Sequence, residues 1–137
     1  MSHIHIYFRP HQTEEALLLK AQIAKEFPEL ILGRFHQKPV GPHPVGSFLI
    51  RAKNEKDERN IIFYLNHKIG NLSAMIHPET GNDFEDHKQE KIQWIGPEFE
   101  IDRSIFPEYR QQTEKNVKQS SFFTKKMKAA NLNYPQL

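Results

Sequence analysis

The chain has 137 residues, of which 37% are hydrophobic and 26% charged, and its formal net charge is +2. This composition suits one water-soluble domain, and no apolar run is long enough to span a membrane. Because there are no cysteines, disulfides and thiolate metal sites are excluded, and any metal must bind to nitrogen or oxygen. No basic and then apolar leader begins the chain, so we expect a cytoplasmic protein.

The charge is unevenly distributed along the chain. Residues 1–108 carry 13 Lys or Arg and 16 Asp or Glu, a net charge of −3, whereas residues 109–137 carry 6 basic and 1 acidic residue, a net charge of +5. A basic end can touch an anionic partner, but the favoured interpretation is a solvated C-terminal extension. A polar helix is predicted within residues 108–130. The acidic body argues against nucleic-acid binding.

The first predicted element is a strand over residues 3–8, HIHIYF, because its residues alternate in polarity. One face of this strand carries Ile4, Ile6 and Phe8, and the other carries His3, His5 and Tyr7. Pro10 ends the strand. Thr13 is then a candidate N-cap for a helix that ends at Pro28, with apolar residues recurring at helical spacing.

The middle of the chain predicts one more helix and three more strands. Residues 29–45 contain several glycines and prolines and few regular signals, which indicates an irregular loop that faces a ligand. Residues 47–52 predict the second strand. A helix follows over residues 57–70, with Asp57 as its cap and a glycine as its stop. Residues 72–77 and 92–96 predict the third and fourth strands.

These elements predict an α+β domain of the ferredoxin-like class, an antiparallel sheet with helices on one face. We assign residues 1–97 to this domain and residues 98–137 to a basic, partly helical C-terminal extension. The strand alternation leaves the second face of the sheet open, and that face carries His5, Tyr7 and His77. An open polar face needs a ligand, a partner subunit or water.

Four histidines are candidates for a metal site. His43 lies between two prolines and His77 directly precedes another, so the backbone around both is restricted. His5 lies within the first strand, and His87 lies in the loop before the last one. None has the spacing of a zinc finger or of an H-E-x-x-H helix, so they can only converge through folding. Taken singly, each is equally well explained as an exposed histidine or part of a rigid turn.

Several longer strings resemble one family. They are HIYF at 5–8, GRFHQKPVGPHP at 33–44, IHPETGNDFEDH at 76–87 and WIG at 94–96. Together they resemble the DOPA 4,5-dioxygenase family, in the family's order and over most of residues 3–97. The resemblance implies a ferredoxin-like domain, often a homodimer, that cleaves a catechol ring in the extradiol position with non-haem iron and O2. FYLNHKIGN at 63–71 departs from the family pattern, and the resemblance does not extend beyond Gly96.

The resemblance places the family's histidines at His5, His36, His43, His77 and His87. From it we predict that the metal ligands come from His5, His43, His77 and His87, without choosing three. The predicted metal is Fe(II), with zinc or another divalent ion expected in some preparations. An extradiol enzyme needs open metal positions for the catechol and for O2, so about three protein ligands suffice.

Other residues are predicted to act on the substrate. A base must take a proton from the catechol, and imidazole near neutral pH can do so, which makes His36 and His87 the candidate catalytic residues. Arg34 can pair with a substrate carboxylate and Tyr7 can donate a hydrogen bond to bound oxygen. The plainer alternatives are a surface ion pair for Arg34 and a half-buried sheet residue for Tyr7.

Three other functions compete with a catechol dioxygenase. A metal-binding or small-molecule-binding domain of the same fold would keep the histidines but form no product. A nucleic-acid-binding domain would need stacking aromatics and a basic sheet face, which the sequence lacks. A purely structural dimerisation module would leave the proline-flanked histidines unexplained. The substrate itself, whether DOPA or a related catecholic acid, is not set by the sequence.

Overall fold

The computed structural model describes residues 1–112 and residue 114. The chain divides into two compact units, Met1–Arg103 and Ser104–Leu137. In the second unit the described residues are helical at 107–112 and 114, and the rest of the helix predicted within 108–130 lies outside the described residues. The division of the chain at residue 97 stays a prediction. No helix in the described part of the chain is both long and apolar enough to cross a membrane.

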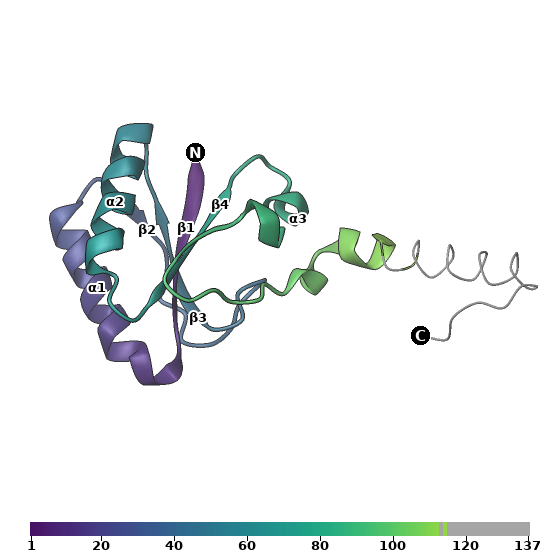
Figure 1. Cartoon of the computed structure of the whole chain (residues 1–137), viewed down its shortest axis with the longest axis horizontal. Helices are drawn as coiled ribbons and strands as arrows, with labels where there is room; N and C mark the ends of the chain where they lie inside the picture. The colour runs from purple at the N-terminus through teal and green to yellow at the C-terminus, as the bar shows by residue number, and fades with distance from the viewer. Residues whose placement is uncertain (113, 115–137) are drawn as a thin grey trace, which may run out of the picture. The chain divides into compact units, whose positions relative to one another are not determined.

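The first unit is built on one antiparallel sheet with the strand order β2-β3-β1-β4-β5 (Figure 1). Its strands are β1 Ser2–Phe8, β2 Ile31–Leu32, β3 Gly46–Arg51, β4 Ser73–Pro78 and β5 Gln93–Ile95. The helices are α1 Thr13–Glu26, α2 Glu55–Lys68 and the short α3 Asp83–Asp86, with the 3-10 turns η1 Pro10–Gln12, η2 Gln89–Lys91 and η3 Arg103–Ile105. Up to β4 the chain runs strand, helix, strand, strand, helix, strand, which confirms the ferredoxin-like class.

Strand β2 completes this topology, and sequence analysis missed it. The segment 29–45 was predicted to be an irregular loop, but Ile31 pairs with Arg51 and Leu32 pairs with Ile50. Two residues are too few for a period of two to be recognised. The structure therefore has five strands, where four were predicted.

Both long helices begin earlier than predicted, α1 at its predicted cap residue and α2 two residues before its predicted cap. Thr13 is the first residue of α1, with Gln12 in the cap position, and the Thr13 hydroxyl donates to the Pro10 carbonyl at 2.8 Å. Helix α2 is capped by Asn54, whose side-chain oxygen accepts from the backbone N–H of Asp57 at 2.8 Å. Asp57 is thus not the cap but the third residue of the helix, whose backbone N–H donates to the cap side chain. A carboxylate at this position suits the helix dipole.

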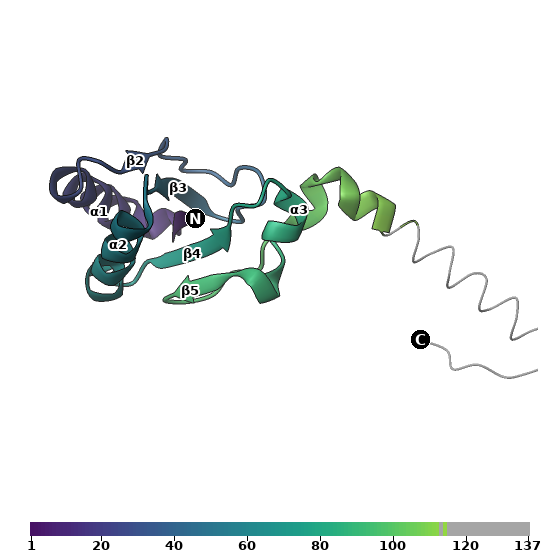
Figure 2. The same cartoon turned by 90° about the horizontal axis from the view of Figure 1, so that it is seen from above.

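One face of the sheet holds the main hydrophobic core under α1 and α2 (Figure 2). Alternate residues of β1 and β4 point into it, as the sequence predicted, and all are at most 5% exposed: Ile4, Ile6, Phe8, Ala74 and Ile76. Leu19 and Ile23 of α1 and Ile61 and Leu65 of α2 close the core from above. Burial of these side chains is the main stabilising contribution in a domain of this size.

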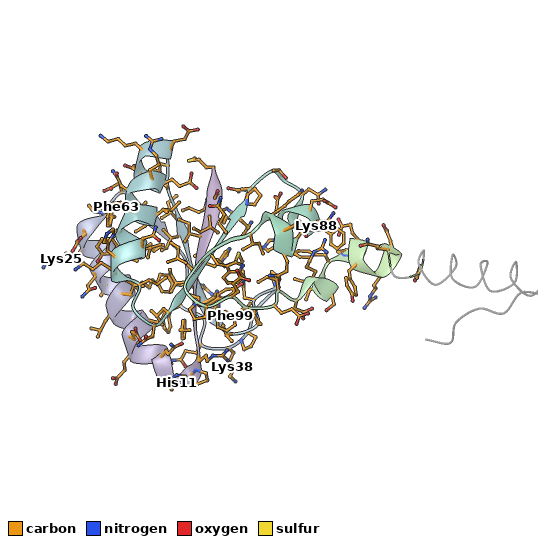
Figure 3. The ribbon with its side chains drawn as sticks, in the orientation of Figure 1. His11, Lys25, Lys38, Phe63, Lys88 and Phe99 are labelled. Carbon is orange, nitrogen blue, oxygen red and sulfur yellow. The ribbon has the colours of Figure 1, made fainter. Side chains whose placement is uncertain are left out.

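The second face of the sheet is covered, which corrects the prediction of an open face. Tyr7 and Met75 are fully buried and pack in a second cluster with Ile92 and Ile101. The cover segment consists of residues 83–92 and 96–103, on either side of β5, and Phe99 lies within it (Figure 3). The segment has too few regular elements for its role to be read from periodicity.

The turn after β5 depends on Gly96, and Gly81 provides a matched control. Both have positive φ angles, +81° at Gly96 and +92° at Gly81. A Cβ at Gly96 would lie 2.6 Å from the Leu72 carbonyl oxygen, whereas one at Gly81 would meet nothing within 4 Å. We expect Gly81→Ala to lower the free energy of unfolding by about 1–2 kcal/mol from backbone strain alone. Gly96→Ala should cost roughly 2 kcal/mol more, because the backbone must also move. Urea titrations of both variants measure the difference, and equal losses would contradict the close contact at Gly96.

Candidate metal centre

Five histidines of the first unit gather on the second face of the sheet. His3 and His5 come from β1, and His77 comes from β4. His43 lies in the loop before β3, and His87 directly follows α3. Neighbouring rings of this histidine cluster are 4.1 to 6.4 Å apart between centroids. The convergence that topology predicted for His5, His43 and His77 is therefore present.

Strand pairing creates the floor of the cluster. In the register of β1 and β4, His3 lies opposite His77, and His5 is two residues further along the same face of β1. The Nε2 atoms of His5 and His77 are 3.2 Å apart. Each of His3, His5 and His77 offers a ligand atom within 4.8 Å of the others. His3, His5 and His77 are therefore the candidate metal ligands that the fold already holds close together.

The spacing of these nitrogens fits a metal ion. Two nitrogens bound to one ion at about 2.1 Å lie roughly 3.0 to 3.4 Å apart, depending on the angle between the bonds. The observed 3.2 Å between His5 and His77 falls in that interval. The same distance also suits a hydrogen bond in which the Nε2–H of His5 donates to His77, so a metal would replace one hydrogen.

His3 adds a buried nitrogen that needs a partner. Its Nε2 lies 2.9 Å from the Glu79 carboxylate, but out of line for a hydrogen bond, so within the described structure it is a buried nitrogen with none. A buried polar atom without a hydrogen bond is rare and costly. The His3 side chain, 22% exposed, is therefore a fitting third ligand for a metal.

Burial favours the neutral form of four imidazoles of the cluster, those of His3, His5, His43 and His77. It lowers the pKa values of His43 and His77 to about 4, with the neighbouring His87 ring adding to the effect. Burial, then His43 and His77, hold the pKa of His5 well below its usual range. Burial also lowers the pKa of His3, although Glu79 opposes this. Neutral imidazole is the form that binds metals, so the site is prepared for a cation at neutral pH.

Backbone carbonyls fix two of the rings. His77 Nδ1 lies 2.8 Å from the Pro78 carbonyl, and His87 Nδ1 lies 2.7 Å from the Asp83 carbonyl. A carbonyl oxygen only accepts, so each Nδ1 must carry a hydrogen, and Nε2 is the nitrogen of each ring that remains for another partner. This arrangement is typical of metal-binding and base-acting histidines, whose second nitrogen is held by a neighbouring acceptor.

The cover segment holds His87 in place through two anchors at α3. Arg103 donates from Nε and Nη2 to the Phe84 carbonyl, at 3.2 and 2.8 Å, and its guanidinium lies 3.8 Å from the Phe84 ring centroid. The buried Asp86 accepts from the backbone N–H and the hydroxyl of Thr80, at 2.8 and 2.7 Å. Burial opposes ionisation of Asp86, but these hydrogen bonds outweigh it and lower its pKa.

A cavity of about 280 Å³ opens beside the histidine cluster, on the β3 side. It is lined by His5, Gly33, Arg34, His36, Val40, His43, Ser47 and Leu49. The lining combines apolar walls with a guanidinium and imidazoles, and its volume suits one small aromatic molecule. The cavity thus brings a candidate substrate pocket against the candidate metal ligands.

The Dopa 4,5-dioxygenase family profile matches residues 2–105, more than half of the chain. The chain belongs to this family. It is 34% identical over 113 residues to a DOPA 4,5-dioxygenase of Amanita muscaria, covering 77% of this chain and 49% of that protein. It is 33% identical over 119 residues to an uncharacterized 21.2 kDa protein of Botryotinia fuckeliana, covering 80% of this chain and 64% of that protein. The chain thus spans only about half to two thirds of the length of these two relatives.

A solved structure supports the same family fold. A Nostoc punctiforme protein described as a "putative dioxygenase" superposes with a TM-score of 0.70 at 28% sequence identity. The match covers 81% of this chain and 91% of the Nostoc chain. The fold of this chain is therefore shared with a protein whose description names a dioxygenase.

The structure can now be compared with the site residues that were predicted from the sequence. His5, His43, His77 and His87 lie in the histidine cluster, and Arg34 and His36 line the adjoining cavity, next to His5 and His43. Tyr7 lies beneath His43 instead of in the cavity lining, with its hydroxyl 2.6 Å from His43 Nδ1. Sequence analysis left out His3, although H-x-H within a strand places both imidazoles on one face.

Acid should destabilise the metal-free protein because its buried histidines are neutral. Their pKa values are about 4 in the fold, at His43 and His77, and about 6.5 when unfolded, so between these values the unfolded chain binds more protons. The free energy of unfolding should be highest above pH 6.5 and fall as the pH decreases toward 4. Urea titrations at pH 7.5 and 5.0, with a chelator present, measure this loss.

Two variants test the source of this pH dependence. His77→Gln removes one buried imidazole and should reduce the loss of stability between the two pH values. His11→Gln alters an exposed histidine next to α1 (Figure 3) and should keep the full loss. Equal urea midpoints at pH 7.5 and 5.0 in the metal-free wild type would contradict the neutral buried cluster.

Proposed function

We propose that this protein is an extradiol dioxygenase that cleaves the ring of a catecholic acid with O2 at a histidine-bound Fe(II). The carrying observation is the histidine cluster that adjoins a cavity lined by Arg34 and His36, in a chain of the Dopa 4,5-dioxygenase family. The Amanita muscaria relative is named for DOPA as its substrate, which supports a catechol with a charged side chain. Both atoms of O2 enter the ring-opened product.

The proposed protein ligands are His3, His5 and His77. They are the group whose ligand atoms lie within 4.8 Å of one another, and His3 contributes a buried nitrogen without a hydrogen bond. His43 and His87, which were predicted as possible ligands, lie over this group at ring distances of 4.2 Å from His5 and 4.1 Å from His77. Three histidines would leave other positions open for a catechol and O2.

The surrounding residues would orient the substrate and move its protons. When bound, Fe(II) would lower the pKa of the catechol hydroxyls and bring the diol and O2 together. His87 holds its Nδ1–H on the Asp83 carbonyl, so its Nε2 can accept a proton. His36, which also lines the cavity, is the second candidate for proton transfer.

The cavity supports a substrate with one ring and an acidic side chain. Its volume of about 280 Å³ accommodates a single aromatic ring, and Arg34 is the cation in its lining. A guanidinium can bind a carboxylate through two parallel hydrogen bonds, which fixes orientation as well as charge. Homodimer formation and iron as the native metal are further parts of the proposal, and they rest on the family resemblance.

A second candidate function is a metal-binding or small-molecule-binding domain without oxygenase activity. The histidine cluster and the cavity would be retained in such a protein, and the chain is shorter than its named relatives. The two functions differ in one observable, consumption of O2 in the presence of a catechol.

His77→Ala should lose both metal and turnover, because His77 contributes the Nε2 nearest to His5. Wild-type protein loaded anaerobically with Fe(II) is offered a panel of catechols, and O2 uptake is followed together with visible absorbance of a ring-opened product. We expect uptake by the wild type and by His11→Gln, and less than about 1% of it in His77→Ala. Bound iron is measured in each protein.

The same experiment separates the two candidate functions. Equimolar iron in the wild type without O2 uptake on any catechol would favour the binding domain. Retention of iron and activity by His77→Ala would refute the proposed ligand set. The iron content of His3→Ala and of His87→Ala decides which imidazole completes the site. The variant that lacks a ligand should no longer bind one equivalent of iron, whereas the other variant should.

Arg34→Gln should raise the KM for catecholic acids while leaving kcat within a few-fold. Arg34 lines the cavity and forms no ion pair with any residue that the structure describes, so the loss falls on substrate binding. The expected increase is about 10- to 100-fold for DOPA, equivalent to roughly 1.5–3 kcal/mol for a charged hydrogen bond. 4-Methylcatechol, which lacks the carboxylate, should show little change. Equal effects on both substrates would contradict carboxylate recognition by Arg34.

A further inference from the structure

The hydrogen bond between Tyr7 and His43 distinguishes His43 from the other rings of the histidine cluster. The Tyr7 hydroxyl lies 2.6 Å from His43 Nδ1. For His77 and His87 the partner of Nδ1 is a carbonyl, which can only accept. A phenol can donate as well as accept, so the hydrogen between Tyr7 and His43 can belong to either residue. The position of this hydrogen decides which nitrogen of His43, Nδ1 or Nε2, carries the lone pair.

The environment of Tyr7 places this hydrogen on the phenol oxygen. Tyr7 is 0% exposed and packs against Trp94 and Phe99, with ring centroids 5.9 and 5.5 Å away. Within the described structure, His43 Nδ1 is the one hydrogen-bond partner of its hydroxyl. If His43 donated instead, the buried phenol hydrogen would have no acceptor among these residues, which native structures avoid.

Burial also keeps both groups in the protonation state that this hydrogen bond needs. It raises the pKa of Tyr7, so the phenol keeps its hydrogen at any physiological pH. The His43 ring lies among other imidazoles, with centroids 4.2 Å from His5 and 6.4 Å from His87, and a neutral ring with one lone pair is the form that suits these neighbours. A neutral ring that accepts at Nδ1 must carry its hydrogen at Nε2.

The loop around His43 is fixed independently of the ring. The backbone N–H of His43 donates to the Val40 carbonyl at 3.1 Å, in a turn that contains Gly41 at φ +57°. The Pro42 carbonyl accepts from the backbone N–H of Asp102 at 3.0 Å, which ties the loop to the cover segment. The backbone that carries His43 is therefore held in place, which fixes the point from which its ring reaches Tyr7.

We infer that Tyr7 donates to His43 Nδ1 and holds His43 in the Nε2–H tautomer, so that His43 is a hydrogen-bond donor to the occupant of the cavity and not a metal ligand. Tyr7 is then a positioning residue, acting through His43. The inference deepens the proposed function, on which it rests for the identity of the occupant. His43 would present N–H where His87 presents a lone pair, so the cover offers one donor and one acceptor to a bound diol or oxygen.

The tautomers can be read directly by two-bond ¹H–¹⁵N correlation spectra of uniformly ¹⁵N-labelled protein at pH 7.5. Spectra are recorded for the metal-free and the Zn(II)-loaded wild type, with signals assigned from single His→Gln variants. We expect the Nε2–H pattern for His43 in both states and the Nδ1–H pattern for His77 and His87. An Nδ1–H pattern for His43 in the zinc-loaded protein would overturn the inference.

A pair of variants tests the role of the hydroxyl. Tyr7→Phe removes the donor and keeps the ring packing, so His43 should show a mixture of tautomers or the Nδ1–H form. Phe99→Leu disturbs the packing around Tyr7 without removing its hydroxyl, and should leave His43 in the Nε2–H form. An unchanged His43 spectrum in folded Tyr7→Phe would show that Tyr7 does not set the tautomer.

Zinc stoichiometry gives an answer that does not depend on Tyr7→Phe folding. His43→Gln should still bind one equivalent of Zn(II) with a Kd within about tenfold of the wild type, whereas His77→Gln should lose the ion. Loss of equimolar zinc in folded His43→Gln would overturn the inference. Failure of the proposed function has a different signature: the expected tautomers and zinc binding, with no O2 uptake on any catechol by the Fe(II)-loaded wild type.

Discussion

Burial of several imidazoles on one face of a sheet is the constraint that the rest of this structure depends on. A buried imidazole must be neutral, and each of its two nitrogens then needs a partner of the right kind, a donor for one and an acceptor for the other. His77 and His87 meet half of this requirement with backbone carbonyls, and His43 meets it with Tyr7. The Nε2 atoms of His5 and His77 still face each other at a distance of 3.2 Å. A cation satisfies such a set of lone pairs better than the rings satisfy each other.

The cover segment is the second consequence of this constraint. Imidazoles exposed on an open sheet face would keep ordinary pKa values, whereas burial lowers the pKa values of His5, His43 and His77. The cover has little regular structure of its own and is held by specific contacts, such as Arg103 on the Phe84 carbonyl and Asp86 on Thr80. Its fixed geometry therefore comes from polar anchors at a few points, in addition to the apolar contacts around Tyr7.

The fold could be predicted from the sequence because alternation and helical spacing are local signals. The site could be predicted only in part, because its residues are brought together by contacts between distant parts of the chain. The faces of β1 and β4 could be predicted from residues such as Ile6 and Ala74, which fixed the side on which His5 and His77 lie. The two-residue strand β2 and the cover carry no periodicity, so the fifth strand and the burial of the second face could not be predicted. His3 could have been, since it shares a strand face with His5. The placement of Tyr7 under His43 depends on a loop conformation that neither residue encodes locally.

Core and site are specified by the same strand, and this ties metal binding to folding. In β1 the even-numbered residues from Ile4 to Phe8 pack under the helices, while His3, His5 and Tyr7 point to the other face. A slip of one residue in the pairing of β1 would exchange these two sets, placing imidazoles in the hydrophobic core. The apolar half of the strand thus enforces the register that brings His3 opposite His77, with no need for the metal to select it. The floor of the site is therefore formed by the fold before any ion arrives, and what a bound ion has left to organise is the cover, where His43 and His87 are placed by loops.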